Sequence, residues 1–405
     1  MIATPTAPDD RNSTLDALHG LALFGVILAD LPLYGSPLLR ELGIAPAGPR
    51  SVLDAMARTA VILFAQTKFL TIFSILFGVS LAMLERRAQK SGQPFLGPYH
   101  RRLAALFALG LVHTVFVWHS VLLLYVPCAW IAARLQRLSS EKILRVSIVC
   151  LVLGAIAPAF AGGLPHPWLE GAARSAFALS RQEATIFAAG TWIDVATLRL
   201  SEFIALYAPL ALGLFGLRTL AMMLLGVYLF RAGFFDETGG ARDRLRAAFR
   251  CGLAFGVPLQ ALSILAPRWM GGAFAPAAMA ARWLCAYFGG FALAFGYIGG
   301  IALLGLRRPP RAAHRVLATI GRASLSGYLL ASLAAALVFY PFGFGLYGRI
   351  GSAECAAIAL ILFSALVVLG AFWLARFKFG PFEWLVRAAS YGRFPSMRLD
   401  PRADP

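Results

Sequence analysis

Four ionisable side chains lie inside long apolar runs of this 405-residue chain: Asp30, Lys68, His113 and His119. Such residues are costly in hydrocarbon, so they usually face the interior of a helical bundle and serve a functional site. A neutral imidazole can take a proton from a hydroxyl or an amine, and an ammonium can stabilise a developing negative charge. The four residues are therefore candidates for a catalytic or a transport site.

Each of the four residues also has a structural interpretation. Lys68 can extend its amine to the membrane surface, and Asp30 can pair with Lys68 only to satisfy both charges. His119, next to a predicted turn, is typical of a solvated loop residue. His113 lies on the middle turn of a run, where a hydrogen bond to a neighbouring helix would satisfy its ring.

The elements that must position these residues are membrane-spanning helices. The chain is 59% hydrophobic and 14% charged, and its apolar runs are too long and too little alternating for the strands of a barrel. We therefore expect an all-α polytopic bundle of about ten spans. The expected spans are residues 15–34, 60–84, 103–118, 120–134, 143–163, 206–231, 248–266, 283–305, 317–340 and 354–376.

Basic clusters between the runs predict how the chain crosses the membrane. They lie at residues 86–90, 100–102, 134–137, 242–246, 307–311 and 376–378. All fall on the cytoplasmic side if both termini are cytoplasmic. The net charge of +18 then indicates topology and contact with anionic lipid headgroups, and no nucleic-acid partner is expected. A break near Gly216 would place residues 242–246 outside, so one crossing over 206–231 is preferred.

One membrane domain over residues 15–376 is the simplest division. It follows a cytoplasmic tail, residues 1–14, and precedes a cytoplasmic amphipathic segment, residues 377–405, in which Phe382, Trp384 and Leu385 are expected to face lipid and Arg387 the headgroups. Residues 164–205 carry charges of both signs and are predicted to form interfacial helices over the outer face.

The runs at 103–118 and 120–134 are barely long enough for two crossings. Each arm has about 15–17 residues, or roughly 25 Å, against a hydrocarbon core of about 30 Å. The tip is therefore predicted to lie below the outer surface, at the floor of a water-accessible pit, with His119 at the tip and His113 one to two turns deeper.

Other kinds of site find no support in the sequence. The five cysteines are widely spaced and include no CxxC, so neither a structural metal nor a disulfide framework is expected. The chain also lacks a phosphate-binding loop, a dinucleotide fingerprint, a zinc-protease motif and a nucleophile elbow.

Five stretches resemble a known group, the YeiB-like family, or domain of unknown function 418. They are RNSTLDALHGLALFGVILADLP (11–32), KFLTIFSILFGVSLAML (68–84), RRLAALFALGLVHTVFVW (101–118), IGRASLSGYLLASL (320–333) and FKFGPFEWLVRAASYG (377–392). The family is distantly similar to transmembrane acyltransferases of the acyltransferase-3 and heparan glucosaminide acetyltransferase type. The resemblance implies about ten helices, an intramembrane histidine and transfer of an acyl group from cytoplasmic acyl-CoA to an acceptor on the far side.

On this resemblance the candidate residues acquire roles. The expected catalytic residues are His113 as general base, Lys68 as oxyanion stabiliser, and Asp30. Trp118, His119 and Tyr328 are expected to bind substrate. The residues expected to hold the phosphates of acyl-CoA are Arg101, Arg102, Arg322 and Ser324.

Three departures from the family pattern matter for these roles. His19 stands where the family usually has arginine, which weakens one expected contact with the cofactor phosphates, and Asp30 stands where it has asparagine. The stretch HSVLL (119–123) lacks the acidic residue of the usual GDIL-like sequence, and with it a partner for His113.

Two other functions stay open from the sequence. Asp30, Lys68 and His113 could form the proton-coupled site of a secondary transporter, and the chain could be a non-catalytic scaffold or sensor. The expected location is the bacterial inner membrane, among membrane lipids. An envelope glycan or lipid is the expected acceptor, and a homo-oligomer is left open.

Overall fold

The computed structural model is an all-α membrane protein, as the sequence predicts. It describes residues 12–36, 51–161, 178–179, 182–208, 211–236, 240–269, 275–307 and 310–399. Within these residues the regular elements are all helices, and the one isolated β-bridge joins Phe377 to Arg398.

The helices follow the expected spans closely. In chain order they are α1 (Ser13–Gly35), α3 (Val52–Phe64), α4 (Lys68–Lys90), α5 (Leu96–Phe116), α6 (Val121–Leu135), α7 (Ser140–Ala161), a helix at residues 182–189, α9 (Trp192–Glu202), η2 (Phe203–Tyr207), η3 (Ala211–Phe215), α11 (Gly216–Arg231), α12 (Ala241–Trp269), α13 (Ala275–Gly305), α14 (Ala312–Gly321), α15 (Ser324–Phe339), α16 (Ser352–Leu374) and α17 (Pro381–Tyr391).

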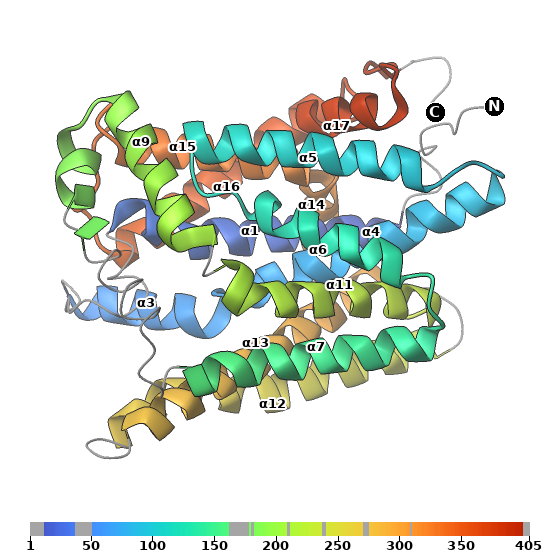
Figure 1. Ribbon diagram of the computed structural model, residues 1–405, viewed down its shortest axis with the longest axis horizontal. Coiled ribbons are helices and arrows are strands. Elements are labelled where there is room, and N and C mark those ends of the chain that lie inside the picture. The colour runs from blue at the N-terminus through green and yellow to red at the C-terminus, as the bar shows by residue number, and fades with distance from the viewer. Residues whose placement is uncertain are drawn as a thin grey trace.

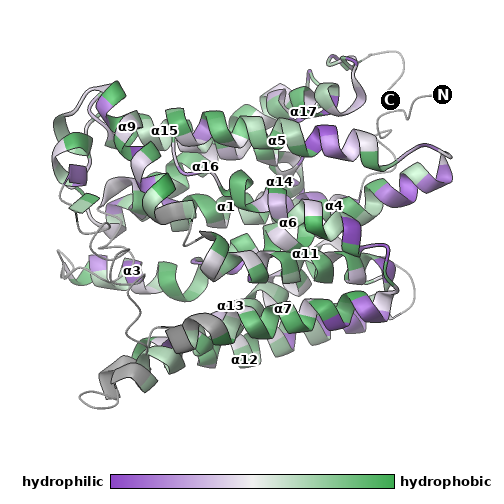
Figure 2. Ribbon diagram, viewed as in Figure 1, coloured by the Kyte–Doolittle hydropathy of each residue, from purple (hydrophilic) through white to green (hydrophobic). Residues whose placement is uncertain are grey.

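Most of the long helices run in one common direction, lengthwise in Figure 1. The segments that lead to both chain termini, α17 and the connection from α4 to α5 lie at one end of the bundle, and α9 lies at the other. Hydrophilic residues gather at the ends of α4, α5 and α7 nearest the termini (Figure 2). We call this the inner end and the end at α9 the outer end. Which side of the membrane each faces stays a prediction.

Among the described residues, five helical stretches are long and apolar enough to cross a membrane. They are Ser13–Gly35, Val52–Lys90, Ala241–Leu265, Ala277–Gly305 and Ser352–Leu374. A sixth is added if α14 and α15 are counted as one bent span, and α6 is apolar but has only 15 residues. The number of ten crossings therefore stays a prediction.

The predicted continuous span over 317–340 is wrong, because α14 and α15 meet at a bend of 83°. The cause is a very close crossing of α14 with α1. A Cβ atom on Gly321 would lie 1.8 Å from the carbonyl oxygen of Asp16, and one on Gly20 would lie 2.1 Å from that of Leu317. Only glycine permits this approach. The chain then turns before α15 begins at Ser324.

Two other expected spans contain local irregularities. The run at 60–84 is divided between α3 and α4, and Thr67, just before α4, has a left-handed φ of 70°. At residues 203–231 the described elements are η2, η3 and α11, and α11 begins at Gly216 directly after the π-helical η3. The single crossing over 206–231 stays a prediction.

Candidate functional site

A cavity of about 950 Å³ extends along the bundle. Its polar lining at the inner end comprises His19, Ser80, Tyr99, Arg102 and Ser324, and at the outer end Asp30, Gln66, Thr67, His119 and Ser120. His19 and Asp30 both lie on α1, eleven residues apart, or about 16 Å along the helix axis. Leucine and phenylalanine side chains line most of the distance between them. One cavity thus joins polar groups near opposite ends of the bundle.

The outer end depends on the tip of the α5–α6 hairpin. The helix α5 ends because the carbonyl oxygen of His113 accepts hydrogen bonds from the backbone N–H groups of Val117 (2.8 Å) and Trp118 (2.9 Å). The Trp118 ring then stacks on Tyr34 of α1, with ring centroids 4.3 Å apart. The Ser120 N–H donates to Thr114 Oγ1 at 3.0 Å. These contacts fix the tip against α1 and place His119 on the cavity wall.

His119 is buried, with 4% of its surface exposed. Its Nε2 lies 3.4 Å from Oε2 of Glu202, which is also buried. The prediction of a solvated tip residue is therefore wrong, because α9 brings Glu202 onto the tip. A carboxylate distant in sequence thus stands beside a histidine, although the acidic residue expected in the hairpin itself is absent.

The buried face of α9 carries a second charge. Val195, Leu198, Arg199 and Glu202 are its buried residues. The Arg199 guanidinium carbon lies 4.2 Å from the ring centre of Tyr340, and the rings of Trp118 and Phe187 lie at 5.5 and 5.7 Å.

Two carboxyl groups lie in the same region. The hydroxyl of Tyr347 donates to Glu183 at 3.5 Å, a long hydrogen bond. Burial raises the pKa of Glu202 to about 7, and the hydrogen bond with Glu183 and the charge of Arg199 oppose this shift.

His113 is also buried, but it does not line the cavity. Its ring centroid lies 5.3 Å from that of Tyr328, which does. His113 therefore lies one ring away from the cavity, whereas His119 borders it.

Lys68 is held away from the cavity by neighbouring helices. Its amine donates to the carbonyl oxygen of Ile62 at 2.7 Å and to Oε1 of Gln260 on α12 at 2.9 Å. These neutral acceptors, and not the Asp30 carboxylate, hold the ammonium. The contacts fit the structural interpretation of Lys68, because they fix the α3–α4 break against α12.

At the inner end, the N-terminus of α15 already holds a carboxylate. Glu383 of α17 accepts hydrogen bonds from the backbone N–H groups of Leu325 (2.7 Å) and Ser326 (3.1 Å), and from the Ser326 hydroxyl. The free N–H groups of a helix start favour an anion. Since Glu383 takes this place, an anionic ligand near Ser324 has to use other donors.

The neighbouring arginines of α5 differ in their surroundings. Arg101 donates through Nε to the carbonyl oxygen of Ser390 at 2.9 Å, so it fastens α17 to α5. Arg102 lines the cavity.

The segment α17 is more than a surface helix. Leu385 is exposed as expected, but the Trp384 indole donates to the carbonyl oxygen of Pro395 at 2.8 Å. The Arg387 guanidinium lies over the Phe379 ring, 4.5 Å from its centre.

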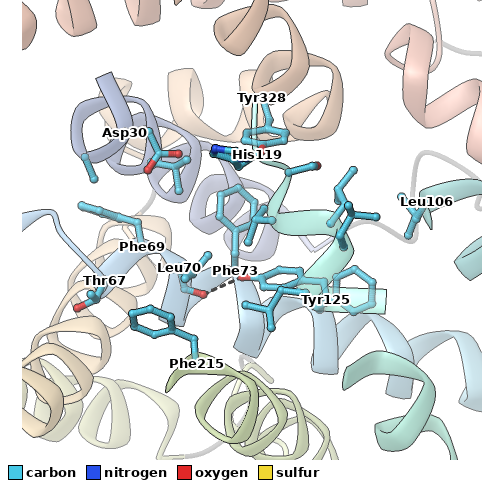
Figure 3. Close-up of a pocket in the computed structure, with 18 of the residues that line it drawn as sticks. Asp30, Thr67, Phe69, Leu70, Phe73, Leu106, His119, Tyr125, Phe215 and Tyr328 are labelled. Atoms are coloured by element: carbon cyan, nitrogen blue, oxygen red, sulfur yellow. Dashed lines mark hydrogen bonds between the residues drawn. The ribbon is translucent and has the colours of Figure 1, made fainter. Parts of the chain in front are cut away.

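The structure divides the predicted site residues into two groups. Those that line the cavity are Asp30, Arg102, Trp118, His119, Ser324 and Tyr328. Those that do not are Lys68, Arg101, His113 and Arg322. Figure 3 shows Asp30, His119 and Tyr328 together in the upper part of the cavity, with Phe73 and Tyr125 below them.

Sequence reasoning missed Glu183, Arg199 and Glu202 as site residues. A signal for two of them was present, because Val195, Leu198, Arg199 and Glu202 have the spacing of one helical face. Charges on an apolar stripe indicate a buried polar cluster. No comparable pattern marks Glu183. Within the described part of the chain, no group of three or more His, Cys, Asp or Glu residues is arranged to bind a metal.

Comparison with known proteins supports the family resemblance. A family model described as "Protein of unknown function (DUF418)" matches residues 229–393. The chain is 26% identical to the uncharacterized protein YxaH of Bacillus subtilis (strain 168), covering 96% of each protein. It is 27% identical to the uncharacterized protein YeiB of Escherichia coli (strain K12), covering 93% of this chain and 96% of that protein. The chain is therefore similar to the DUF418 family over residues 229–393 and to these two relatives over nearly its full length.

Proposed function

We propose that the chain is an acyltransferase of the bacterial inner membrane, which moves an acyl group from cytoplasmic acyl-CoA to an envelope acceptor. One observation supports this most: a single cavity has an arginine, Arg102, at its inner end and a histidine–carboxylate pair at its outer end. A group-transfer enzyme needs both parts, because one end binds an anionic donor and the other removes a proton.

In this proposal His119 is the general base. The acceptor hydroxyl or amine attacks the thioester carbon and forms the new ester or amide bond. His119 takes the proton that the acceptor loses, and the carbon–sulfur bond then breaks. The imidazolium returns the proton to the CoA sulfur, which leaves as the thiol. Glu202 stabilises the imidazolium between these steps.

The proposal gives the role of base to His119 and not to His113, because only His119 borders the cavity. His113 becomes a positioning residue behind Tyr328. Asp30, also on the wall, is placed to accept a hydrogen bond from the acceptor head. At the other end, Arg102 pairs with a donor phosphate.

The test is release of CoA thiol by protein in lipid nanodiscs supplied with palmitoyl-CoA and bacterial envelope lipids. Loss of a general base typically lowers the rate by about 10²–10⁴-fold, so His119→Gln should lower the rate of thiol release within that range. The matched control is His314→Gln, since His314 is a buried histidine on α14 that does not line the cavity. Equal rates in the two variants would contradict the proposal.

A second function, secondary transport, is favoured by one observation. Asp30 is an ionisable group on the wall of a cavity that extends toward both ends of the bundle, which is the arrangement of a proton-coupled carrier. Liposomes with an internal pH-sensitive dye and bacterial envelope extract outside would test it. Proton uptake that depends on the extract and disappears in Asp30→Asn, without thiol release from acyl-CoA, would favour transport over acyl transfer.

A further inference from the structure

The cavity reaches the lipid-facing surface of the bundle at α5. Phe107 and Leu111 are 48% and 45% exposed, and both also line the cavity. They belong to an apolar stripe of α5 that continues at Val112, which is 54% exposed but does not line the cavity. This stripe belongs to the predicted span over 103–118, so it is expected to face hydrocarbon. The cavity therefore has a side opening toward lipid chains.

The part of the cavity behind this opening is apolar. The aliphatic residues that line it come from α5, the α5–α6 hairpin and α15, and they are Leu106, Leu111, Leu122, Leu123 and Leu325. In Figure 3, Leu106 lies across the view from Asp30 and His119. We call this region the apolar limb. A sugar placed here would lose hydrogen bonds to water without replacing them, which is costly, whereas a hydrocarbon chain fits it.

The length of the limb suits a lipid chain. Phe107 lies nine residues before Phe116, the last residue of α5, or about 14 Å at the rise of an α-helix. One leaflet contributes about 15 Å to the hydrocarbon core. A lipid whose head contacts His119 and Asp30 can therefore lay its chain along the limb and leave the bundle between Phe107 and Leu111.

We propose that the acceptor is a membrane lipid with a hydroxyl or amine head, which enters sideways and lies with its chain in the apolar limb. This inference rests on the proposed acyl transfer, since it names the acceptor class for the same site. The other acceptor class, a water-soluble glycan, would leave the limb empty.

The test uses a long-chain alcohol with a diazirine near the end of its chain, in nanodiscs of phosphatidylethanolamine and phosphatidylglycerol. After illumination, labelled peptides are identified by mass spectrometry. Label is expected on Leu106 and Leu122, which are buried and shielded from bulk lipid. The variant Leu111→Trp narrows the limb, and displacing about two methylene groups should reduce this label about tenfold. The control Val112→Trp, on the same stripe but away from the cavity, should not reduce it.

Two results would overturn the inference: equal labelling of Leu106 and Leu122 in the two tryptophan variants, or label confined to the exposed residues of α5. Its failure can be separated from that of the proposed function. If Leu106 and Leu122 are labelled equally in both tryptophan variants while a water-soluble amine acceptor still supports thiol release, the lipid acceptor is excluded and acyl transfer stands. If labelling is as expected but acyl-CoA is never consumed, the lipid site stands and acyl transfer fails.

Discussion

At the outer end of the cavity, two side chains from separate segments are buried against each other: His119 of the hairpin tip and Glu202 of α9. Asp30 of α1, which is half-buried, lines the same cavity. At the inner end, Glu383 accepts hydrogen bonds from the backbone N–H groups at the start of α15, and Arg102 lines the cavity. The outer end thus has the low-dielectric surroundings that strengthen acid–base chemistry, and the inner end has a cation suited to binding an anion.

This difference indicates what substitutions at each end should do. Charge removed at the outer end should change the chemical step, because in the proposed mechanism the pair there acts on a proton. Charge removed at the inner end should change either the attachment of α17 or the affinity for the donor, depending on whether the residue faces the protein or the cavity.

After His119→Gln, the largest effect is expected from Glu202→Gln. Without the carboxylate, the imidazolium of His119 loses its stabilising charge, and the rate of thiol release should fall about 100-fold. Since burial raises the pKa of Glu202 to about 7, the carboxyl is charged above that pH and protonated below it. Activity of the unaltered protein should therefore decline below about pH 7, whereas Glu202→Gln should be slow at every pH. A pH–rate profile of the two proteins measures both effects.

The pH profile also separates chemistry from simple support of the fold. If Glu202 only holds α9 on the hairpin, then Glu202→Gln should lower the melting temperature and keep the shape of the profile. The catalytic role is supported if the activity of Glu202→Gln no longer declines below about pH 7 while α9 keeps its protection from hydrogen exchange.

The second prediction concerns the inner end and stability. Glu383→Gln replaces a partly buried carboxylate that accepts hydrogen bonds from two N–H groups and a hydroxyl, and should destabilise the fold by about 2 kcal/mol. Thermal unfolding in detergent measures the change. Glu141→Gln is the control, because the Glu141 side chain is 85% exposed in its ion pair with Arg145, and such pairs contribute about 1 kcal/mol or less. If the two variants unfold alike, Glu383 does not hold α15.

The third prediction separates binding from stability at the same end. Arg102→Gln should raise the KM for acyl-CoA about tenfold with kcat unchanged, since it removes one charge-assisted contact made equally in ground and transition states. Steady-state kinetics with varied acyl-CoA tests this. A lower kcat at unchanged KM would instead place Arg102 in the chemical step. The inner end would then not be a site of donor binding alone.

The fold could be predicted from the sequence because lipid demands long apolar runs, and their lengths fixed nearly every helix. The bend between α14 and α15 could not be predicted in this way. It depends on a backbone contact between α1 and α14, through Gly20 and Gly321, which are some 300 residues apart. A hydropathy pattern records the polarity of each segment but not the distance between two helices.

The site was predictable only in part, for a related reason. The sequence placed Asp30, Lys68 and His119 inside apolar runs, but it does not show which way a side chain points. Lys68 faces Gln260, while Asp30 and His119 face the cavity. Glu202 was missed because it lies in a segment expected to cover the outer face, about 80 residues from the histidine that it contacts.

The smallest effect is expected from Arg101→Gln, beside Arg102. Arg101 donates one hydrogen bond to the Ser390 carbonyl oxygen, and its loss should destabilise the attachment of α17 by about 1 kcal/mol. Hydrogen exchange over residues 381–391 should become faster, while the KM for acyl-CoA should not change. Equal increases of KM in Arg101→Gln and Arg102→Gln would mean that the two arginines act only as a basic surface. A difference between these adjacent residues would show that the cavity, and not the net charge around it, selects the donor.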